Sequence, residues 1–172
     1  FAALRIDGSV VTWGDSVYGG NSSLVAAKLD GTLDVTQVFA TEQAFAALRV
    51  DGSVVAWGDS IYGGDSSLVA PKLDGTLDVT QIFSTTGAFA ALRTDGSVVT
   101  WGASSYGGDI SAEASKLDGT IDVTQICSTG ATFAALRTDG SVVTWGYPSY
   151  GGNSTSVSTK LDGTVDVIQI CA

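Results

Sequence analysis

The chain has 172 residues with 18 acidic and 8 basic side chains, a net charge of −10 at pH 7, and no histidine. This excess of carboxylates disfavours binding to nucleic-acid phosphates and to anionic lipids. Without histidine, the chain has no serine–histidine–aspartate triad and no histidine-ligated zinc. Its two cysteines are too few for a thiolate zinc site. No apolar run reaches the roughly 20 residues of a membrane span, so we expect no membrane insertion.

A unit of 44 residues is repeated four times, and residues 1–44 are identical to residues 45–88 at 35 of 44 positions. The sequence Phe-Ala-Ala-Leu-Arg begins at Phe1, Phe45, Phe89 and Phe133. A fixed period of this length is typical of propellers, solenoids and other repeat arrays. We expect one repeat domain over residues 1–172, as a segment of a longer protein. Its repeats are 1–44, 45–88, 89–132 and 133–172, the last one short by four residues.

The first predicted element of each repeat is a β-hairpin, here described for residues 44–57. Two β-rich runs flank Asp51-Gly52, and Asp-Gly favours a two-residue type I′ turn. That turn places Leu48 opposite Val55 and Ala46 opposite Trp57. Both faces of the hairpin are largely apolar, so we expect each sheet to be sandwiched between the sheets of neighbouring repeats.

The rest of the repeat is predicted to contain one further strand and a less regular segment. Tyr62-Gly63-Gly64 marks a loop, residues 67–73 a fourth strand, Asp74-Gly75 a turn, and residues 79–83 a third strand. No helical period is sustained. The chain is therefore expected to be all-β, a β-propeller-type array with 3–4 antiparallel strands in each repeat. A β-solenoid or stacked hairpins remain alternatives, because two Asp-Gly turns per repeat would suit them.

The motif Ala-Leu-Arg-x-Asp-Gly-Ser-Val-Val-x-Trp-Gly, at residues 3–14 and in three further copies, resembles the regulator of chromosome condensation repeat. The same superfamily includes β-lactamase inhibitor protein II. The resemblance covers nearly the whole chain and implies a β-propeller, which has seven blades in those relatives. It transmits no single function. Tyr-Gly-Gly replaces the family's Gly-Gln-Leu-Gly element, and the near-identical repeats look more like those of large bacterial surface proteins.

The ends of the chain are out of phase with the predicted blades. Residues 164–171 lack a hairpin partner in their own repeat, and within one chain only residues 1–5 can supply it. Ring closure, an eight-bladed ring of two chains and open head-to-tail assembly all satisfy this pattern. The candidate assembly edges are Phe1, Leu4, Val165, Val167, Gln169 and Cys171.

The candidate partner contacts lie in the glycine-rich loops, where the repeats differ most. Tyrosine is favoured at interfaces. The candidates are Tyr18, Tyr62, Tyr106, Tyr150, Asp15, Asp59 and Tyr147. In contrast, Trp57 and its equivalents follow the pattern of core residues. Cys127 and Cys171 occupy a position held by phenylalanine in other repeats, so we expect them to be buried.

Carboxylates recur in pairs, such as Asp74 with Asp78, next to the second Asp-Gly turn. Turn formation explains them, and calcium is the alternative ligand. We expect no cofactor, no catalytic residue and no enzymatic activity, since near-identical repeats supply one residue set four times. The leading interpretation is a structural or interaction module of a bacterial extracellular or surface protein, assembling with itself through its edge strands. A propeller that binds or inhibits one protein, and a lectin, are the alternatives.

Overall fold

The chain folds into four antiparallel sheets, here called blades, in the computed structural model, which describes all 172 residues. The first strand of each three-stranded blade comes from the repeat before the one that supplies its hairpin. Blade 1 consists of β1 (Ala2–Leu4) and β2 (Val10–Thr12). Blade 2 has β3 (Val35–Ala40), β4 (Ala44–Arg49) and β5 (Val54–Gly58). Blade 3 has β6 (Val79–Ser84), β7 (Ala88–Arg93) and β8 (Val98–Gly102). Blade 4 has β9 (Val123–Ser128), β10 (Thr132–Arg137) and β11 (Val142–Gly146).

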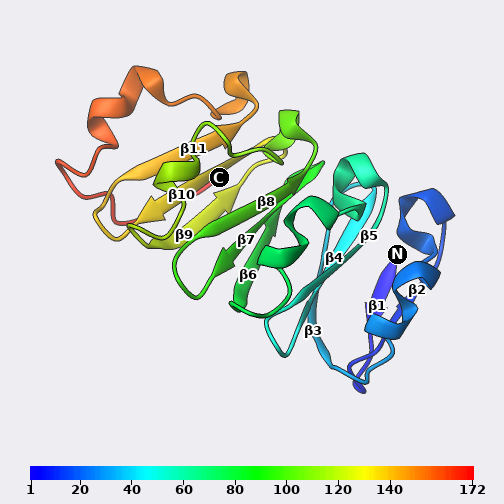
Figure 1. Cartoon of the computed structure of the whole chain (residues 1–172). Helices are drawn as coiled ribbons and strands as arrows, with labels where there is room; N and C mark the ends of the chain where they lie inside the picture. The colour runs from blue at the N-terminus through cyan, green and yellow to red at the C-terminus, as the bar shows by residue number, and fades with distance from the viewer.

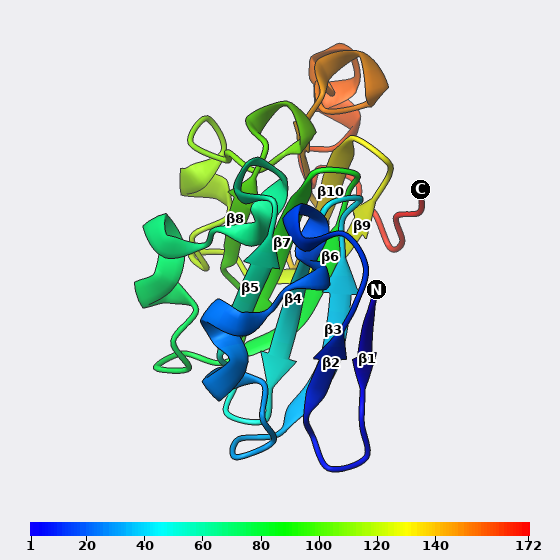
Figure 2. The ribbon, with the colours of Figure 1, turned by 90° about the vertical axis from the view of Figure 1, so that its right-hand side faces the viewer.

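The blades lie side by side in an open array, with the two termini near its opposite ends (Figure 1). Figure 2, viewed along the array, places β3 and β6 on one side and β5 and β8 on the other, with the short helices beyond them. No strand pairs with a strand of another blade, which excludes the continuous sheets of a solenoid. The prediction of an all-β repeat array is confirmed.

Short helices, not a fourth strand, follow the last strand of each blade. They are η1 (Ser16–Gly20), η2 (Ser23–Lys28), η3 (Ser60–Gly64), η4 (Ser67–Lys72), η5 (Ser104–Tyr106), η6 (Ala114–Lys116), η7 (Pro148–Tyr150) and η8 (Thr155–Lys160). The fourth strand predicted over residues 67–73 is therefore wrong. The Asp65 carboxylate accepts a bond from the Ser67 amide, and the amides of Val69 and Leu73 bond three residues back. No helix of the chain is long and apolar enough to cross a membrane.

The predicted hairpin register is also wrong, by one residue on one strand. Leu48 lies opposite Val54, and Phe45 lies opposite Trp57. A type I′ turn needs positive φ at both central residues, but only glycines have positive φ in this chain, Gly52 among them at +72°. The loop is thus a three-residue turn closed by a glycine in the left-handed region. A one-residue change in the loop changes which side chains share a face.

The apolar core is divided among the interfaces between blades. The interface of blades 2 and 3 joins Ala46 and Leu48 from one face of blade 2 with Phe89, Val99 and Trp101 from the facing side of blade 3. Two further clusters join blades 1 and 2 and blades 3 and 4. The prediction that a sheet is sandwiched between its neighbours is confirmed for blades 2 and 3, while blades 1 and 4 each pack against one neighbour.

The last residues of the chain follow the path of the next blade without forming a strand. The Gln125 side-chain amide donates 3.0 Å to the Ile170 carbonyl, and the Ile170 amide donates back at 3.4 Å. Cys127 is half-buried and Cys171 is exposed, both as free thiols. The prediction of two buried cysteines is therefore wrong: Phe39 and Phe83, at the same position of earlier repeats, are also only half-buried, so this position is not a core position. Ring closure within the chain does not occur, since β1 pairs only with β2.

Candidate partner-binding groove

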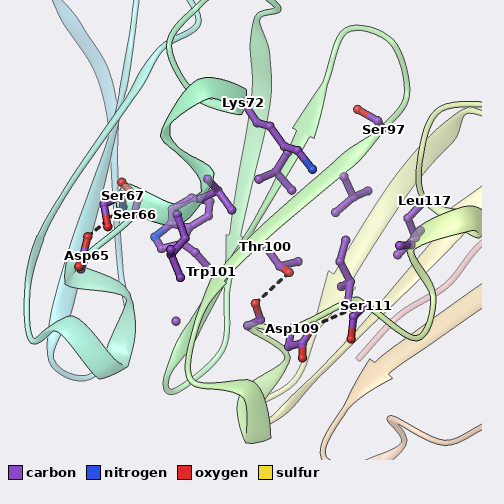
Figure 3. Close-up of a pocket in the computed structure, with 18 of the residues that line it drawn as sticks. Asp65, Ser66, Ser67, Lys72, Ser97, Thr100, Trp101, Asp109, Ser111 and Leu117 are labelled. Atoms are coloured by element: carbon purple, nitrogen blue, oxygen red, sulfur yellow. Dashed lines mark hydrogen bonds between the residues drawn. The ribbon is translucent and has the colours of Figure 1, made fainter.

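A groove of about 900 Å³ runs along the outer strand β8, between blades 2 and 3. Its first wall is the segment 60–72 of blade 2, and its second wall is the segment 108–118 of blade 3. Figure 3 shows Asp65, Ser67 and Lys72 on the first wall, Thr100 and Trp101 on the floor, and further side chains on the second wall. The volume lies within the range of about 300–1,000 Å³ of small-ligand sites.

The first wall is fixed to the next blade by the Tyr-Gly-Gly element. Gly63 has φ +101°, and a β-carbon there would lie 2.7 Å from the Phe89 ring. Trp101, which is 4% exposed, donates from its indole nitrogen to the Gly63 carbonyl at 3.0 Å. Asp59 caps the element by accepting bonds from the amides of Ile61 and Tyr62 at 2.9 and 3.2 Å. The loop conformation thus depends on contacts with blade 3.

The second wall is joined to β8 by two hydrogen bonds. The Val98 amide bonds to the Leu117 carbonyl at 2.9 Å, and the Thr100 hydroxyl bonds to the Gly108 carbonyl at 3.1 Å. These contacts fix where residues 108–118 lie relative to the floor. The groove therefore has two walls that are both anchored on blade 3.

Exposed apolar side chains line this groove. Leu68 is 99% exposed and Ile61 is 66% exposed, while Val69 and Ile110 are half-buried. Single exposed leucines are common on protein surfaces, but apolar side chains gathered in a groove typically mark a binding site.

The charged groups of the groove are distributed unevenly along it. Asp65 and Asp109 accept bonds from the amides of Ser67 and Ser111, each at 2.8 Å. The amide of Ser67, and then its hydroxyl, lower the pKa of Asp65, so this carboxylate is charged at neutral pH. Lys72 makes no ion pair and lies near the Ser97 end of the groove, away from Asp65 and Asp109 (Figure 3).

An equivalent groove, of about 570 Å³, lies one repeat further along. Its lining is more polar, because Glu113 stands where the first groove has Val69, and Ser154 stands where it has Ile110. Lys116, equivalent to Lys72, forms an ion pair with Glu113 at 2.6 Å. Two sites with the same backbone therefore differ in the apolar character of their walls.

The structure does not bring the predicted contact residues together at either groove. Tyr18 is exposed. Tyr62 and Tyr106 are half-buried, with ring centroids 6.4 Å apart. Tyr147 and Tyr150 form an exposed pair at 5.3 Å. Asp15 caps η1, as Asp59 caps η3. None of these residues lines a groove, and their role in partner contact stays a prediction.

The predicted edge residues lie at the two ends of the array. Phe1, Leu4 and Val165 are among the exposed large apolar side chains. Gln169 and Cys171 are exposed and Val167 is half-buried. Whether they mediate assembly stays a prediction.

The sequence interpretation missed the groove, although a signal for it exists. The repeat position of Ile61 holds Val17 in the first repeat but Ser105 and Ser149 in the last two. The repeat position of Leu68 likewise changes to Ala112 and Ser156. Apolar character that is kept in two repeats and lost in two others points to an exposed position with a local role.

The recurring aspartates form turns. Asp74 accepts a bond from the Thr76 amide at 2.8 Å, and the same contact holds for Asp30, Asp118 and Asp162. No group of three or more acidic or cysteine side chains is placed to hold a metal ion, and calcium binding stays untested.

No model of a protein family matches the chain, and no curated protein matches its sequence. Solved structures do match. Human WBSCR16 is 20% identical over 84% of this chain and 44% of its own, with a TM-score of 0.53. The CRINKLY WD40 ectodomain of the Arabidopsis thaliana receptor kinase ACR4 is 18% identical over 85% of this chain and 51% of its own, with a TM-score of 0.52.

WD40 proteins are β-propellers, so these likenesses identify the fold as propeller-type. Prp20p from Saccharomyces cerevisiae also matches, at 22% identity over 67% of this chain and 31% of its own, with a TM-score of 0.46. The chain spans about half or less of the length of these structures. The propeller-type fold that the resemblance to the regulator of chromosome condensation repeat implies is supported, and the family itself and the bacterial surface type stay predictions.

Proposed function

We propose that this chain is a non-enzymatic propeller-type module that binds a protein partner through the groove between blades 2 and 3. The observation that carries the proposal is the exposed apolar lining of Ile61 and Leu68 in a groove whose copy one repeat later is polar. A purely structural role would not require this difference, since both grooves share one backbone design.

The test is a selection of random 12-residue peptides on the wild-type chain and on a groove variant. The groove variant combines Leu68→Ala, Val69→Glu and Ile110→Ser, and each new residue already stands at the equivalent position of the second groove. The substitutions are therefore compatible with the fold. We expect peptides enriched on the wild type to bind the variant at least about tenfold more weakly.

A matched control changes the second groove instead, by Glu113→Val and Ser154→Ile. These residues are those of the first groove, and the control should retain wild-type affinity for the selected peptides. Failure to enrich any peptide on the wild type would overturn the proposal. Equal affinity for the wild type and the groove variant would do the same.

A second proposal, head-to-tail assembly, has its own observation. The Val167 amide bonds to the Gly140 carbonyl, as the Val123 amide bonds to Gly96 at the start of the inner strand β9, and β1 has no third strand beside it. By analogy with the pairing of β3 with β4, Ile170 of one copy would lie opposite Ala3 of the next. In a longer protein, neighbouring repeats would cover the same two edges.

Light scattering on the 172-residue chain tests this second proposal. We expect masses that are multiples of the chain and increase with concentration. Leu4→Pro, which disrupts the β1 edge, should return the mass to that of one chain. A single-chain mass at every concentration would exclude assembly.

Placement in a bacterial extracellular array is likewise a proposal, which is supported by the strict repetition and the acidity of the sequence.

A further inference from the structure

The outer edge of β8 offers unpaired backbone groups to the groove. In the equivalent hairpin of blade 1, Phe1 and Trp13 exchange both of their backbone bonds, so Phe89 and Trp101 form the corresponding pair in blade 3. Because hydrogen-bonded and non-bonded pairs alternate in an antiparallel ladder, the backbone groups of Val98 and Thr100 point away from β7, toward the groove.

The Thr100 amide is the distinctive group on this edge. The Val98 amide is satisfied by Leu117, but the Thr100 amide has no hydrogen-bond partner in the chain. Thr100 is only 6% exposed, and it is one of the residues that line the groove. Buried amides of native proteins almost always have a partner, so a ligand with a well-placed carbonyl would complete this site.

From this geometry we infer that the occupant of the groove is an extended polypeptide segment that adds to β8 as a further strand. The inference rests on the proposed function and specifies how the partner binds. Strand addition supplies backbone bonds for affinity, and side chains at alternate positions supply specificity. Because the Val98 amide is already bonded to Leu117, the segment would pair with the part of β8 from Thr100 to Gly102, which corresponds to about three residues at about 3.3 Å each.

The side chains of the groove predict the composition of that segment. Ile61 and Leu68 on one wall and Ile110 on the other favour apolar residues at alternate positions. Asp65 and Asp109 flank the end of the groove opposite Lys72 (Figure 3). Each of these two carboxylates bonds an amide through Oδ1, which leaves Oδ2 available. A basic residue at this end of the segment is therefore complementary, in a chain whose net charge is −10.

The charge requirement can be tested without disturbing the turns. Asn21 and Asn153 stand at the equivalent positions in the first and fourth repeats, and each accepts the same amide bond. The double variant Asp65→Asn with Asp109→Asn should thus keep the fold and remove two charges. We expect the most enriched 12-residue peptide to contain arginine or lysine, and to bind this variant about tenfold more weakly at low salt. A neutral or acidic peptide, or unchanged affinity, would overturn the charge assignment.

The strand geometry is tested by amide hydrogen exchange measured by NMR, with the same peptide as the probe. The Thr100 amide should exchange at least about tenfold more slowly in the complex, while the Ala56 amide at the equivalent position of blade 2 should be unchanged. In an added strand, alternate peptide N–H groups point toward β8 and away from it. Methylation of the nitrogens that face β8 should abolish binding, and methylation of those that face away should be tolerated. Strand addition is wrong if the exchange rate of the Thr100 amide is unchanged in the complex and both sets of methylated peptides bind equally. The proposed function still stands in that case, provided that the peptide binds the wild type and binds the groove variant more weakly.

Discussion

The indole nitrogen of Trp101 donates a hydrogen bond of 3.0 Å to the carbonyl oxygen of Gly63, a residue 38 positions earlier in the preceding blade. The Trp101 ring also stacks on Phe89, with centroids 5.1 Å apart. The same bond joins Trp57 to Gly19 and Trp145 to Gly107. A loop backbone and two aromatic rings therefore connect each pair of successive blades.

Replacing Gly63 by alanine tests this connection. Alanine at φ +101° is strained, and its β-carbon would lie 2.7 Å from the Phe89 ring. We expect Gly63→Ala to lower the free energy of unfolding by about 2–4 kcal/mol. Urea denaturation followed by circular dichroism measures the change.

Gly130→Ala is the matched control. Gly130 has no positive φ, and the nearest atom to its added β-carbon is the Thr86 hydroxyl oxygen at 3.5 Å. A change of less than about 0.5 kcal/mol is expected there. Equal effects of the two substitutions would contradict the role given to Gly63.

Replacing Trp101 by phenylalanine removes the bond to Gly63 and part of a buried ring. The Gly63 carbonyl would lose its partner, and we expect a loss of about 1–3 kcal/mol in unfolding free energy. Trp13→Phe should cost much less, because Trp13 is 51% exposed and lacks the indole hydrogen bond that Trp57, Trp101 and Trp145 make. Thermal unfolding of both variants measures the difference, and a larger effect at Trp13 would argue against the connection.

Substitution of leucines at two positions separates folding from binding. Leu68 is 99% exposed and Leu73 is 2% exposed. Leu68→Ala should change the unfolding free energy by less than about 0.5 kcal/mol, whereas Leu73→Ala should cost about 2–5 kcal/mol. A large loss at Leu68 in urea denaturation would mean that this side chain serves the fold and not a partner.

Stability should fall with acidification through the turn aspartates. The amide of the threonine two residues later, and then its hydroxyl, lower the pKa of Asp30, Asp74 and Asp118. A carboxyl with a lowered folded pKa stabilises the fold above its unfolded pKa of about 3.9, and that contribution is lost as the pH falls through the folded value. The urea midpoint should therefore be nearly constant from about pH 7 to 5 and decrease below about pH 4.

The triple variant Asp30→Asn, Asp74→Asn, Asp118→Asn provides the control for this pH dependence. Asparagine keeps the acceptor oxygen but does not titrate. The variant should show a smaller decrease of the urea midpoint below about pH 4 than the wild type. An identical decrease would assign the acid sensitivity to other groups.

Much of the fold could be predicted from the repeat. The period, the apolar faces and the core position of Trp57 and its equivalents in the later repeats follow from alternating hydrophobicity, which packing then enforces. The register could not be predicted, because Asp51-Gly52 fits two loop lengths and only the φ of Asp51 decides between them. The segment 67–73 failed as a strand for a similar reason: capping by Asp65 competes with extended structure, and sequence alone does not weigh the two.

The groove was beyond sequence reasoning for a different reason. Its walls come from two repeats and its floor is β8, so no single run of residues carries the pattern. Tyrosine is common at interfaces, which favours the tyrosines as contact residues, yet Tyr62 and Tyr106 pack around Gly87 between neighbouring repeats. Comparison of Val69 with Glu113, position by position, was the more informative signal.

The division of the apolar core among pairs of blades has a consequence for cooperativity. Each cluster joins only two neighbouring blades. The stability of the array is therefore approximately the sum of the stabilities of the single blades and of the interfaces between neighbours, with no core shared by all blades. Blade 1, coupled on one side only, should fray before blade 3, which is coupled on both. An additional blade adds one more interface of the same kind and requires no change in the others. This explains how nearly identical copies of one short sequence can form a stable protein.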